Sequence, residues 1–380
     1  MCSDFKIRIF QPIVPEYRVA LFDGLGERYG NRIEIWADQA IGQDKSYPLS
    51  KMKYDYGHPL KRIGPVVWQK GLSLAGLGKG DVIIICGDVH QLSSLWIAVR
   101  AKRLGVAVIW WGHHRTASST DRAVKIRLAV ARKVCDVFLA YTRTGIGYLT
   151  SWGFEESSVF ATGNTIDQTP IKEAIAAWSS DKLARFQEEQ GINGKKMLVC
   201  CSVLRPKVRL DLAIRTLASD RLSDVVFAVI GDGSEQEFYQ RLASELCVAD
   251  RIKWIGATRD QMVMAPWFLS AKAFVYPGAI GLSILHSFSY GLPVITHGNA
   301  EHQMPEFEVM EDGKTGLCFE EGDKTDLERK ICSLLGNESA RLKMGNYCRI
   351  LAYERYSMAQ MVSNFCDAIE VAHNKVTMHK

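Results

Sequence analysis

Residues 276–296 read Tyr276-Pro277-Gly278-Ala279-Ile280-Gly281-Leu282-Ser283-Ile284-Leu285-His286-Ser287-Phe288-Ser289-Tyr290-Gly291-Leu292-Pro293-Val294-Ile295-Thr296. An apolar run leads into a glycine-rich loop, Ser283 is placed to cap a helix, and Gly291 is placed to end it before a second apolar run. Backbone N–H groups at Gly281, Leu282 and Ser283 would face an anion, which the helix dipole also attracts. His286 would lie one turn further on. The segment therefore predicts a βαβ unit whose loop is either an anion site or an ordinary glycine turn.

Apolar, β-rich runs of similar length lie on both sides of this segment and alternate with helical patterns. The first series comprises Lys6–Phe10, Arg32–Trp36, Val82–Cys86, Val106–Trp111, Val137–Tyr141 and Ser158–Ala161. The second comprises Met197–Val203, Val225–Ile230, Ile252–Ile255, Ala273–Tyr276 and Val294–Thr296. Apolar strands separated by helices are typical of parallel, doubly wound sheets, whose ligands bind at the carboxyl ends of the strands.

Two such series in 380 residues predict an α/β protein with two Rossmann-like domains. We expect a first domain over residues 1–167, a linker over 168–195, a second domain over 196–345 and closing helices over 346–380. The linker is placed where the chain is polar and helical in pattern and shows no strand signal.

The composition is typical of a soluble globular protein, with 47% hydrophobic and 23% charged residues. No apolar run reaches the roughly 18 residues of a membrane span, and the ten cysteines follow no zinc or disulfide spacing, so we expect a protein of the reducing cytosol. Residues 1–170 hold 22 Lys and Arg against 15 Asp and Glu, a net charge of +7, whereas the remainder has 25 against 27, a net charge of −2. The first half is either mildly basic without consequence or faces an anionic partner such as a membrane surface, a lipid diphosphate or nucleic acid.

Three cations, Arg205, Lys207 and Arg209, crowd the loop after the strand Met197–Val203. Arg and Lys side chains stabilise the charge that develops on a departing diphosphate, although loops with three cations are also common on protein surfaces. The position of this loop at the carboxyl end of a strand favours the first interpretation.

Polar residues also follow the strands of the first half. His113, His114 and Arg115 come directly after Trp110-Trp111. A Trp ring can form a platform for a sugar and His or Arg can bind its hydroxyls; the alternative is a Trp pair in the core beside exposed histidines. The remaining candidates, all expected on the acceptor side or else ordinary surface charges, are Glu16, Arg18 and His90.

The segment 276–296 resembles the signature of the family 4 glycosyltransferases, which runs Pro-Ser, Glu, Gly-Phe-Gly-Leu, Leu-Glu and then Gly-x-Pro-Val-Ile. The chain also matches the family's order with Ile230-Gly231-Asp232-Gly233 upstream, and with Pro305-Glu306 and Glu311-Asp312-Gly313-Lys314-Thr315-Gly316 downstream. The resemblance covers residues 196–330 well, and the first half in layout and a few residues only.

The chain departs from this pattern at several positions. The family's two glutamates, eight residues apart, which contact the donor sugar and the ribose, fall on Gly278 and His286. In strict register, Val203 and Val208 occupy the positions of the family's two diphosphate-neutralising cations. The three cations of this chain lie at other positions of the same loop. These differences indicate a divergent branch of the family.

The resemblance implies the GT-B fold, with a central cleft between the domains, and transfer of a hexose or deoxyhexose from a nucleoside diphosphate sugar with retention of configuration. It implies a glycan or lipid-linked acceptor in surface polysaccharide synthesis, peripheral contact with the cytosolic face of a membrane, and no cofactor, metal or nucleic acid. The resemblance places His113, Arg205 and Lys207 at the reaction, and His114 could equally be the histidine that the family has there. The donor-binding residues would be Arg209, Gly231, Gly233, Gly281, Leu282, Ser283, His286 and Glu306, and the acceptor-binding residues Glu16, Arg18, His90, His114 and Arg115.

Other classes of protein fit the sequence less well. No Gly-x-Gly-x-x-Gly follows a strand, and neither a nucleotide-hydrolase phosphate loop nor a Gly-x-Ser-x-Gly elbow is present. A sugar-nucleotide epimerase and a catalytically silent binding module of the same fold stay open. The helix expected over Asp121–Val134 gathers Arg122, Lys125, Arg132 and Lys133 on one face, which is either a membrane-surface face or an ordinary solvated one.

Overall fold

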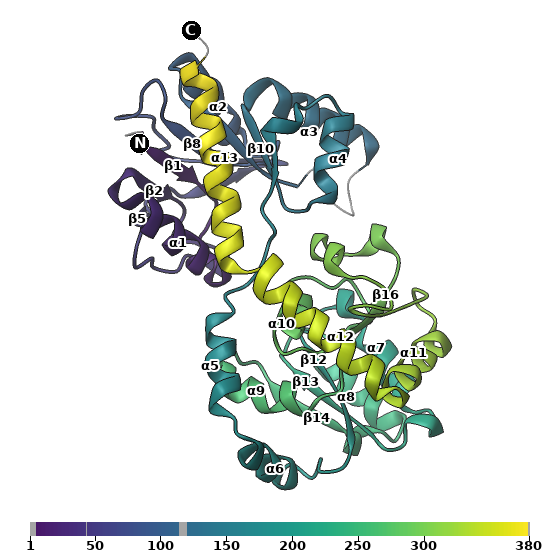
Figure 1. The fold of residues 1–380 in the computed structure, drawn as a ribbon. Helices are drawn as coiled ribbons and strands as arrows, with labels where there is room; N and C mark the ends of the chain where they lie inside the picture. The colour runs from purple at the N-terminus through teal and green to yellow at the C-terminus, as the bar shows by residue number, and fades with distance from the viewer. Residues whose placement is uncertain (1–4, 43, 114–119, 379–380) are drawn as a thin grey trace. The chain divides into compact units, whose positions relative to one another are not determined.

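The computed structural model describes residues 5–42, 44–113 and 120–378. By its internal contacts the chain divides into two compact units, one reaching to Asn164 and including the chain from Met358 onward, the other spanning Thr165–Ser357. Each unit is built on one parallel sheet with helices around it (Figure 1). The predicted α/β class with two parallel-sheet domains is therefore confirmed.

The first unit contains a seven-stranded sheet in the order β11-β10-β9-β8-β1-β2-β5. Its strands are β1 (Ile7–Phe10), β2 (Ile33–Trp36), β5 (Lys53–Asp55), β8 (Val82–Cys86), β9 (Ala107–Gly112), β10 (Val137–Ala140) and β11 (Val159–Ala161). Two antiparallel hairpins stand beside it, β3 (Ala40–Ile41) with β4 (Asp44–Lys45), and β6 (Leu60–Ile63) with β7 (Val66–Gln69). The sequence did not predict β5 or the hairpins, because these strands are short and mostly exposed.

Helices cover both faces of this sheet, as a doubly wound fold requires. Buried residues of α1 and α13 form one core with alternate residues of β1 such as Ile7 and Ile9, whereas α2 and α3 pack against Phe10 on the opposite face. The helices are α1 (Val19–Tyr29), α2 (Leu92–Arg103), α3 (Asp121–Val134), α4 (Thr144–Ser151) and α13 (Met358–Met378). Figure 1 shows α13, the last helix of the chain, lying along this sheet.

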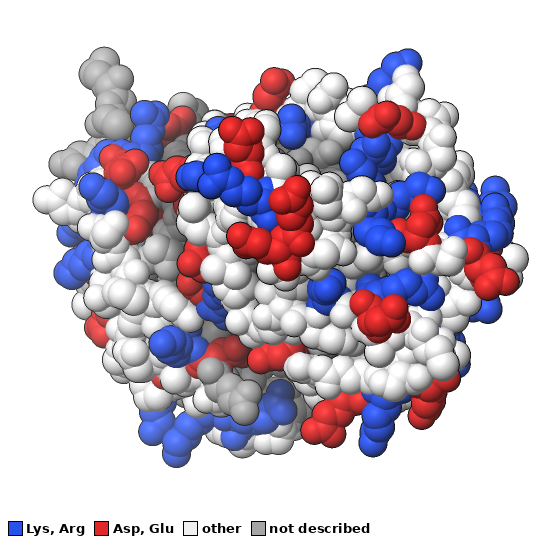
Figure 2. Space-filling model, turned by 90° about the horizontal axis from the view of Figure 1, so that it is seen from below, with Lys and Arg blue, Asp and Glu red and all other residues white. Residues whose placement is uncertain are grey.

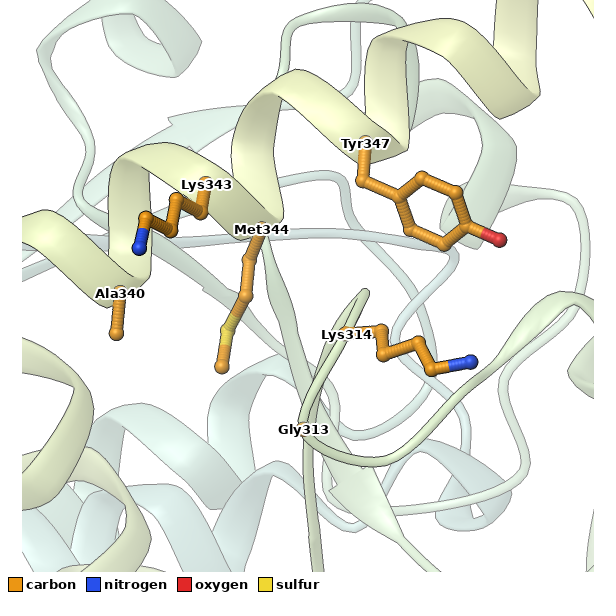
Figure 3. A pocket seen from close by; sticks show the side chains of 6 residues that line it. All are labelled: Gly313, Lys314, Ala340, Lys343, Met344 and Tyr347. Atoms are coloured by element: carbon orange, nitrogen blue, oxygen red, sulfur yellow. The ribbon is translucent and has the colours of Figure 1, made fainter.

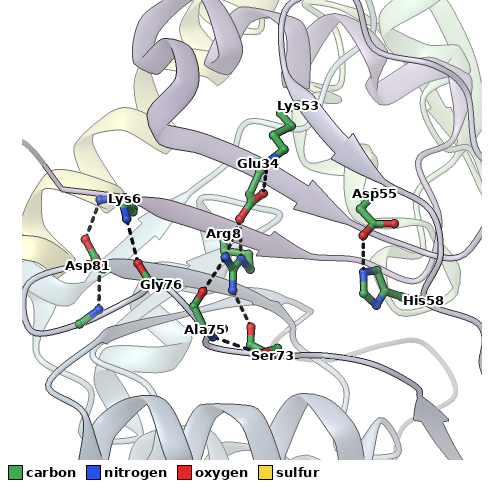
Figure 4. Close-up of polar contacts among 11 residues, drawn as sticks. Lys6, Arg8, Glu34, Lys53, Asp55, His58, Ser73, Ala75, Gly76 and Asp81 are labelled. Carbon is green, nitrogen blue, oxygen red and sulfur yellow. Dashed lines mark hydrogen bonds and ion pairs between the residues drawn. The ribbon is translucent and has the colours of Figure 1, made fainter.

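One charged side chain of β1 is buried under the sheet. The Arg8 guanidinium donates to Glu34 Oε1 at 2.7 Å, to Ser73 O at 2.7 Å and to Ala75 O at 3.1 Å (Figure 4). It also lies 4.2 Å from the centre of the Trp36 ring. Arg8 thus ties the segment before β8 to β1 and β2, and a buried cation is acceptable there because its hydrogen bonds are satisfied.

The second unit contains a six-stranded parallel sheet in the order β14-β13-β12-β15-β16-β17. Its strands are β12 (Lys196–Cys201), β13 (Val225–Ile230), β14 (Ile252–Gly256), β15 (Ala273–Val275), β16 (Val294–His297) and β17 (Gly316–Phe319). Its helices are α5 (Thr169–Ala177), α6 (Ser180–Glu189), α7 (Leu210–Leu217), α8 (Gln236–Glu245), α9 (Gln261–Ser270), α10 (Ser283–Ser289), α11 (Lys324–Gly336) and α12 (Glu338–Ile350). A π-helical turn, Leu351–Arg355, follows α12.

Two local expectations need correction. The stretch expected as a linker consists of α5 and α6, which pack on α9 of the second unit; Gln187 Nε2, for example, donates to Ser270 Oγ at 3.1 Å. Ser283 is the first residue of α10 and not its cap. The cap position is Leu282, which forms no side-chain cap hydrogen bond, so His286 lies one position deeper in the helix than the sequence predicted.

Candidate functional site

Three loops at the carboxyl ends of β12, β13 and β15 are joined through their backbones. Leu204 N donates to Asp232 O at 2.7 Å, which links the loops after β12 and β13. Gly231 and Gly233 have φ angles of 132° and 156°, and a Cβ at either would overlap the backbone of the loop after β12. These glycines therefore allow two loops to approach more closely than side chains would permit.

The loop after β15 approaches the same cationic loop from the other side. Ala279 N donates to Lys207 O at 3.0 Å. A Cβ at Gly278 would overlap that carbonyl oxygen, although the φ angle of Gly278 is not positive. Position 278, where the resembling family has a glutamate, thus has no room for any side chain in this backbone.

The loop between β12 and α7 buries Leu204 and Val208 and exposes its cations. Val208 is fully buried, whereas Arg205, Lys207 and Arg209 point to solvent. Arg209 Nε donates to Asp211 Oδ1 at 3.2 Å. Within the described part of the chain neither Arg205 nor Lys207 pairs with a carboxylate, so both cations are available to an anion.

The turn Gly281–Ser283 follows β15 and leads into α10, whose first residue is Ser283. Ile280 N donates to Gln303 Oε1 at 2.7 Å, and the same amide group of Gln303 donates to Thr296 Oγ1 and His297 O. A Cβ at Gly281 would lie 3.8 Å from Glu306 Oε2, so the Glu306 carboxylate stands beside the turn. A carboxylate accepts hydrogen bonds from sugar hydroxyls but repels phosphate, so Glu306 suits a hydroxyl of the donor.

His286 is buried away from this group. Its Nε2 lies 2.9 Å from Gln261 Oε1, which also accepts a hydrogen bond from the Tyr290 hydroxyl, and its ring meets the edge of Phe268. Burial lowers the pKa of His286 to about 4, so the ring is neutral at pH 7. None of the contacts described for His286 joins it to the cationic loop.

In the first unit, Arg18 is held among aromatic rings where β1, β9 and β10 end. Its Nη2 donates to the Tyr141 hydroxyl at 2.8 Å, and its guanidinium lies 4.0 Å from the Trp111 ring centre. Nη1 is buried without a hydrogen-bond partner, and no carboxylate among the described residues pairs with Arg18. The His113 ring stacks on Tyr141 with centroids 4.2 Å apart, so Arg18 and His113 share one neighbour.

The other first-unit candidates are dispersed. His90 is exposed and lies 2.9 Å from Asp88 Oδ1, and Glu16 begins the short helix before α1. His114 and Arg115 lie outside the described residues. Trp110 and Trp111 are buried, so the interpretation of the Trp pair as core is correct and the sugar-platform hypothesis for it is wrong.

Sequence reasoning missed Gln303 and Tyr141. Gln303 connects β16 to Ile280, the residue before the turn Gly281–Ser283, and Tyr141 contacts both Arg18 and His113. The position of Tyr141 at the end of a predicted strand was a usable signal. No local pattern marks Gln303, which reaches its partner across 23 positions of sequence.

A surface pocket of about 310 Å³ lies elsewhere in the second unit, between α12 and the turn before β17 (Figure 3). It is lined by Gly313, Lys314, Ala340, Lys343, Met344 and Tyr347. Glu311 pairs with Lys314 at 3.0 Å and accepts from the Tyr347 hydroxyl at 2.9 Å. The pocket adjoins the amino end of β17, so it is separate from the loops at the carboxyl edge.

The described residues contain neither a metal-ligand cluster nor a membrane-spanning helix. No cluster of three or more His, Cys, Asp or Glu side chains is arranged to hold a metal ion. Among the same residues, no helix combines the length and apolar character needed to cross a bilayer.

Comparisons with known proteins agree with this fold. Anabaena HepE in complex with UDP superimposes with a TM-score of 0.70 at 14% identity, covering 96% of this chain and 100% of that one. A glycosyltransferase from Rickettsia africae gives a TM-score of 0.72 at 11% identity over the full length of both chains. The fold is that of the GT-B glycosyltransferases.

The family evidence concerns the second unit. Residues 182–350 match the family model for "Glycosyl transferases group 1". The chain is 28% identical over 179 residues to the GDP-mannose-dependent alpha-(1-6)-phosphatidylinositol monomannoside mannosyltransferase of Mycolicibacterium smegmatis, covering 43% of this chain and 45% of that protein. It is 27% identical over 194 residues to the N-acetyl-alpha-D-glucosaminyl L-malate synthase of Bacillus anthracis, covering 48% of each. The match spans about half the length of these relatives.

Proposed function

We propose that the protein is a glycosyltransferase that moves a hexose or deoxyhexose from a nucleoside diphosphate sugar to a glycan or lipid-linked acceptor. The observation that carries the proposal is the pair of unpaired cations, Arg205 and Lys207, held by backbone contacts beside the turn Gly281–Ser283. This group lies within the region that matches the glycosyltransferase model. A diphosphate carries two to three negative charges and suits such a site.

In the proposed reaction the bond between the sugar C1 and the diphosphate oxygen breaks, and a bond forms between C1 and the acceptor oxygen. The acceptor proton passes to the departing diphosphate, on the same face of the sugar, so the configuration is retained. Arg205, Lys207 and Arg209 stabilise the diphosphate, and Glu306 binds a donor hydroxyl. His113 positions the donor sugar, while Arg18, Glu16 and His90 contribute to acceptor binding.

The proposal includes a role in surface polysaccharide synthesis at the cytosolic face of a membrane, without a cofactor or a metal ion. The names of two relatives support it. One is the phosphatidylinositol monomannoside mannosyltransferase described above. The other is the lipopolysaccharide core biosynthesis glycosyltransferase LpsE of Rhizobium meliloti, which is 28% identical over 127 residues. Activity that disappears with EDTA and returns with manganese would contradict the metal-free scheme.

A silent binding module is the second candidate. The backbone at Gly278 favours it, because the carboxylate that contacts the donor sugar in the resembling family has no room there. The experiment incubates the purified protein with a panel of UDP- and GDP-sugars and follows release of the nucleoside diphosphate. A transferase hydrolyses its own donor slowly, an epimerase interconverts the sugar, and a silent module does neither. Proton NMR of the anomeric coupling in a transfer product then tests retention.

A further inference from the structure

The first unit exposes large apolar side chains that its core does not use. Ile63 at the tip of the β6–β7 hairpin is 63% exposed, and Leu92, Trp96 and Val99 of α2 are 40%, 40% and 41% exposed. Spacings of four and three residues place the last three on one side of the helix. Trp68 of the hairpin lies against Trp96 with ring centroids 5.9 Å apart, so hairpin and helix form one surface. We call these residues the hairpin–helix surface.

The two segments that form this surface carry charged side chains of one sign only. Residues 57–70 and 92–103 contain no Asp or Glu, and their exposed cations are Lys61, Arg62, Lys70, Arg100, Lys102 and Arg103. Of these, Lys102 pairs with Asp136 at 2.7 Å; within the described chain the other five pair with no carboxylate. By contrast, Lys and Arg mix with Asp and Glu on the face drawn in Figure 2. An apolar surface with unpaired cations is complementary to an anionic, amphipathic partner.

The hairpin is also attached to a loop of the proposed acceptor side. Val67 N donates to His90 O at 2.8 Å, and Gln69 N donates to Ser93 Oγ at the start of α2 at 2.9 Å. Whatever binds the hairpin–helix surface is therefore held near the loop that carries His90.

We propose that the hairpin–helix surface docks on a bilayer that contains anionic lipids. Arg100 lies over the Trp96 ring at 4.8 Å, and Lys61 lies on the same face of the hairpin as Ile63 and opposite Trp68 in register. Both groups combine an apolar side chain with a cation, as residues at the headgroup boundary do. The apolar side chains of the hairpin–helix surface protrude from a hairpin tip and a helix face. Protruding side chains can insert between lipid headgroups, because a bilayer is fluid. Docking at this site would bring the His90 loop to a lipid-linked acceptor, and that consequence rests on the proposed function.

The helix α3 provides a matched control. It exposes Arg122, Lys125 and Lys133, and its Ile126 is 52% exposed, but it has no aromatic residue. Charge alone would make α3 as good a membrane surface as the hairpin and α2.

The test measures co-sedimentation of the full-length protein with vesicles of phosphatidylcholine alone and of phosphatidylcholine mixed with an equal part of phosphatidylglycerol. We expect binding to the mixed vesicles only. Ile63→Glu and Trp96→Glu should each weaken it by about tenfold or more, since each loses apolar burial and adds a repelled charge. Lys61→Glu with Arg62→Glu should weaken it further, because each cation near an anionic bilayer contributes about fivefold. Ile126→Glu should leave binding within about twofold.

Equal losses in Ile63→Glu and Ile126→Glu, or no binding of the wild type to the mixed vesicles, would overturn the proposal. Thermal unfolding identifies a variant that has lost its fold, and the tip residue Ile63 keeps the test valid if Trp96→Glu unfolds. The vesicle experiment contains no donor or acceptor, so its outcome does not depend on transferase activity. Conversely, donor hydrolysis that stays at the wild-type rate in Ile63→Glu shows that the proposed donor site is intact when docking fails.

Discussion

Gly278 and Gly281 lie three positions apart in one loop, but only Gly281 has space for a side chain. A Cβ at Gly278 would overlap the Lys207 carbonyl, whereas a Cβ at Gly281 would meet nothing closer than Glu306 Oε2 at 3.8 Å. The loop after β15 is therefore shaped by backbone contact at one glycine and left open at the other.

We expect Gly278→Ala to lower the free energy of unfolding by about 1–3 kcal/mol, because the loop after β12 must move to admit the methyl group. Gly281→Ala should change it by less than about 0.5 kcal/mol. Urea denaturation of both variants measures the difference. Equal stability of the two would mean that the loops do not meet as described.

His286 makes the stability of the second unit depend on pH. An unfolded histidine has a pKa near 6.5, whereas burial lowers the pKa of folded His286 to about 4. Above pH 6.5 both states are neutral and the free energy of unfolding is unaffected. As the pH falls from 6.5 toward 4 the unfolded state binds a proton that the folded state does not, so stability is lost, by at most about 3 kcal/mol.

The variant His286→Phe should lack this part of the pH dependence, since Phe does not titrate and Gln261 still accepts from the Tyr290 hydroxyl at 3.0 Å. Thermal unfolding between pH 7.5 and pH 4.5 checks the expectation. A variant whose midpoint falls as steeply as that of the wild type would show that other groups are responsible.

At the scale of elements, the loop between β12 and α7 exposes three cations, although none of them occupies the positions that the cations have in the resembling family. Leu204, Val208 and Leu210 are buried and anchor the loop. The positions between them therefore face solvent, and Arg205, Lys207 and Arg209 occupy these. A cation at position 208 would be buried in the core of the second unit.

Removal of Arg205 or Lys207 should lower turnover by about a hundredfold, if these cations stabilise the departing diphosphate as proposed. The stability of Arg205→Ala and Lys207→Ala should stay near that of the wild type because both side chains are exposed. Arg221→Ala is the matched control, since Arg221 is exposed and pairs with Glu328 at 3.3 Å away from these loops. Near-normal kcat in both loop variants would refute their assignment.

At the scale of the whole molecule, the first unit is completed by the last helix of the chain. Met361, Phe365 and Ile369 of α13 are buried in the core that contains α1 and β1. The Phe365 ring meets Trp111 edge-on with centroids 4.8 Å apart. The core of the first unit therefore includes residues that follow the whole second unit in the chain.

Phe365→Ala should lower the free energy of unfolding of the first unit by about 3–5 kcal/mol, because it leaves a cavity against the sheet. Met378→Ala in the same helix should have no measurable effect, since Met378 is 76% exposed. Hydrogen exchange resolved by peptide measures both units separately. Loss of protection confined to the second unit in Phe365→Ala would contradict this assignment.

The sequence determined the fold class because apolar runs that are buried on both faces of a parallel sheet leave a local signal, and every predicted strand was found close to its expected bounds. It also predicts where the site should lie, because the carboxyl-end rule needs only the order of strands and loops. The exposed strand β5 and the hairpins gave no such signal.

Only the tertiary structure decided which candidate residues meet. His286 contacts Gln261, 25 positions away, and Gln303 holds a turn 23 positions upstream, while Arg18 meets Tyr141 across 123 positions. Local spacing says where a residue lies on its own helix or loop but not which distant side chain packs against it. The closing of the loop over Gly278, the burial of His286 and the exposed hairpin–helix surface all follow from such distant contacts, since packing is a property of the folded chain.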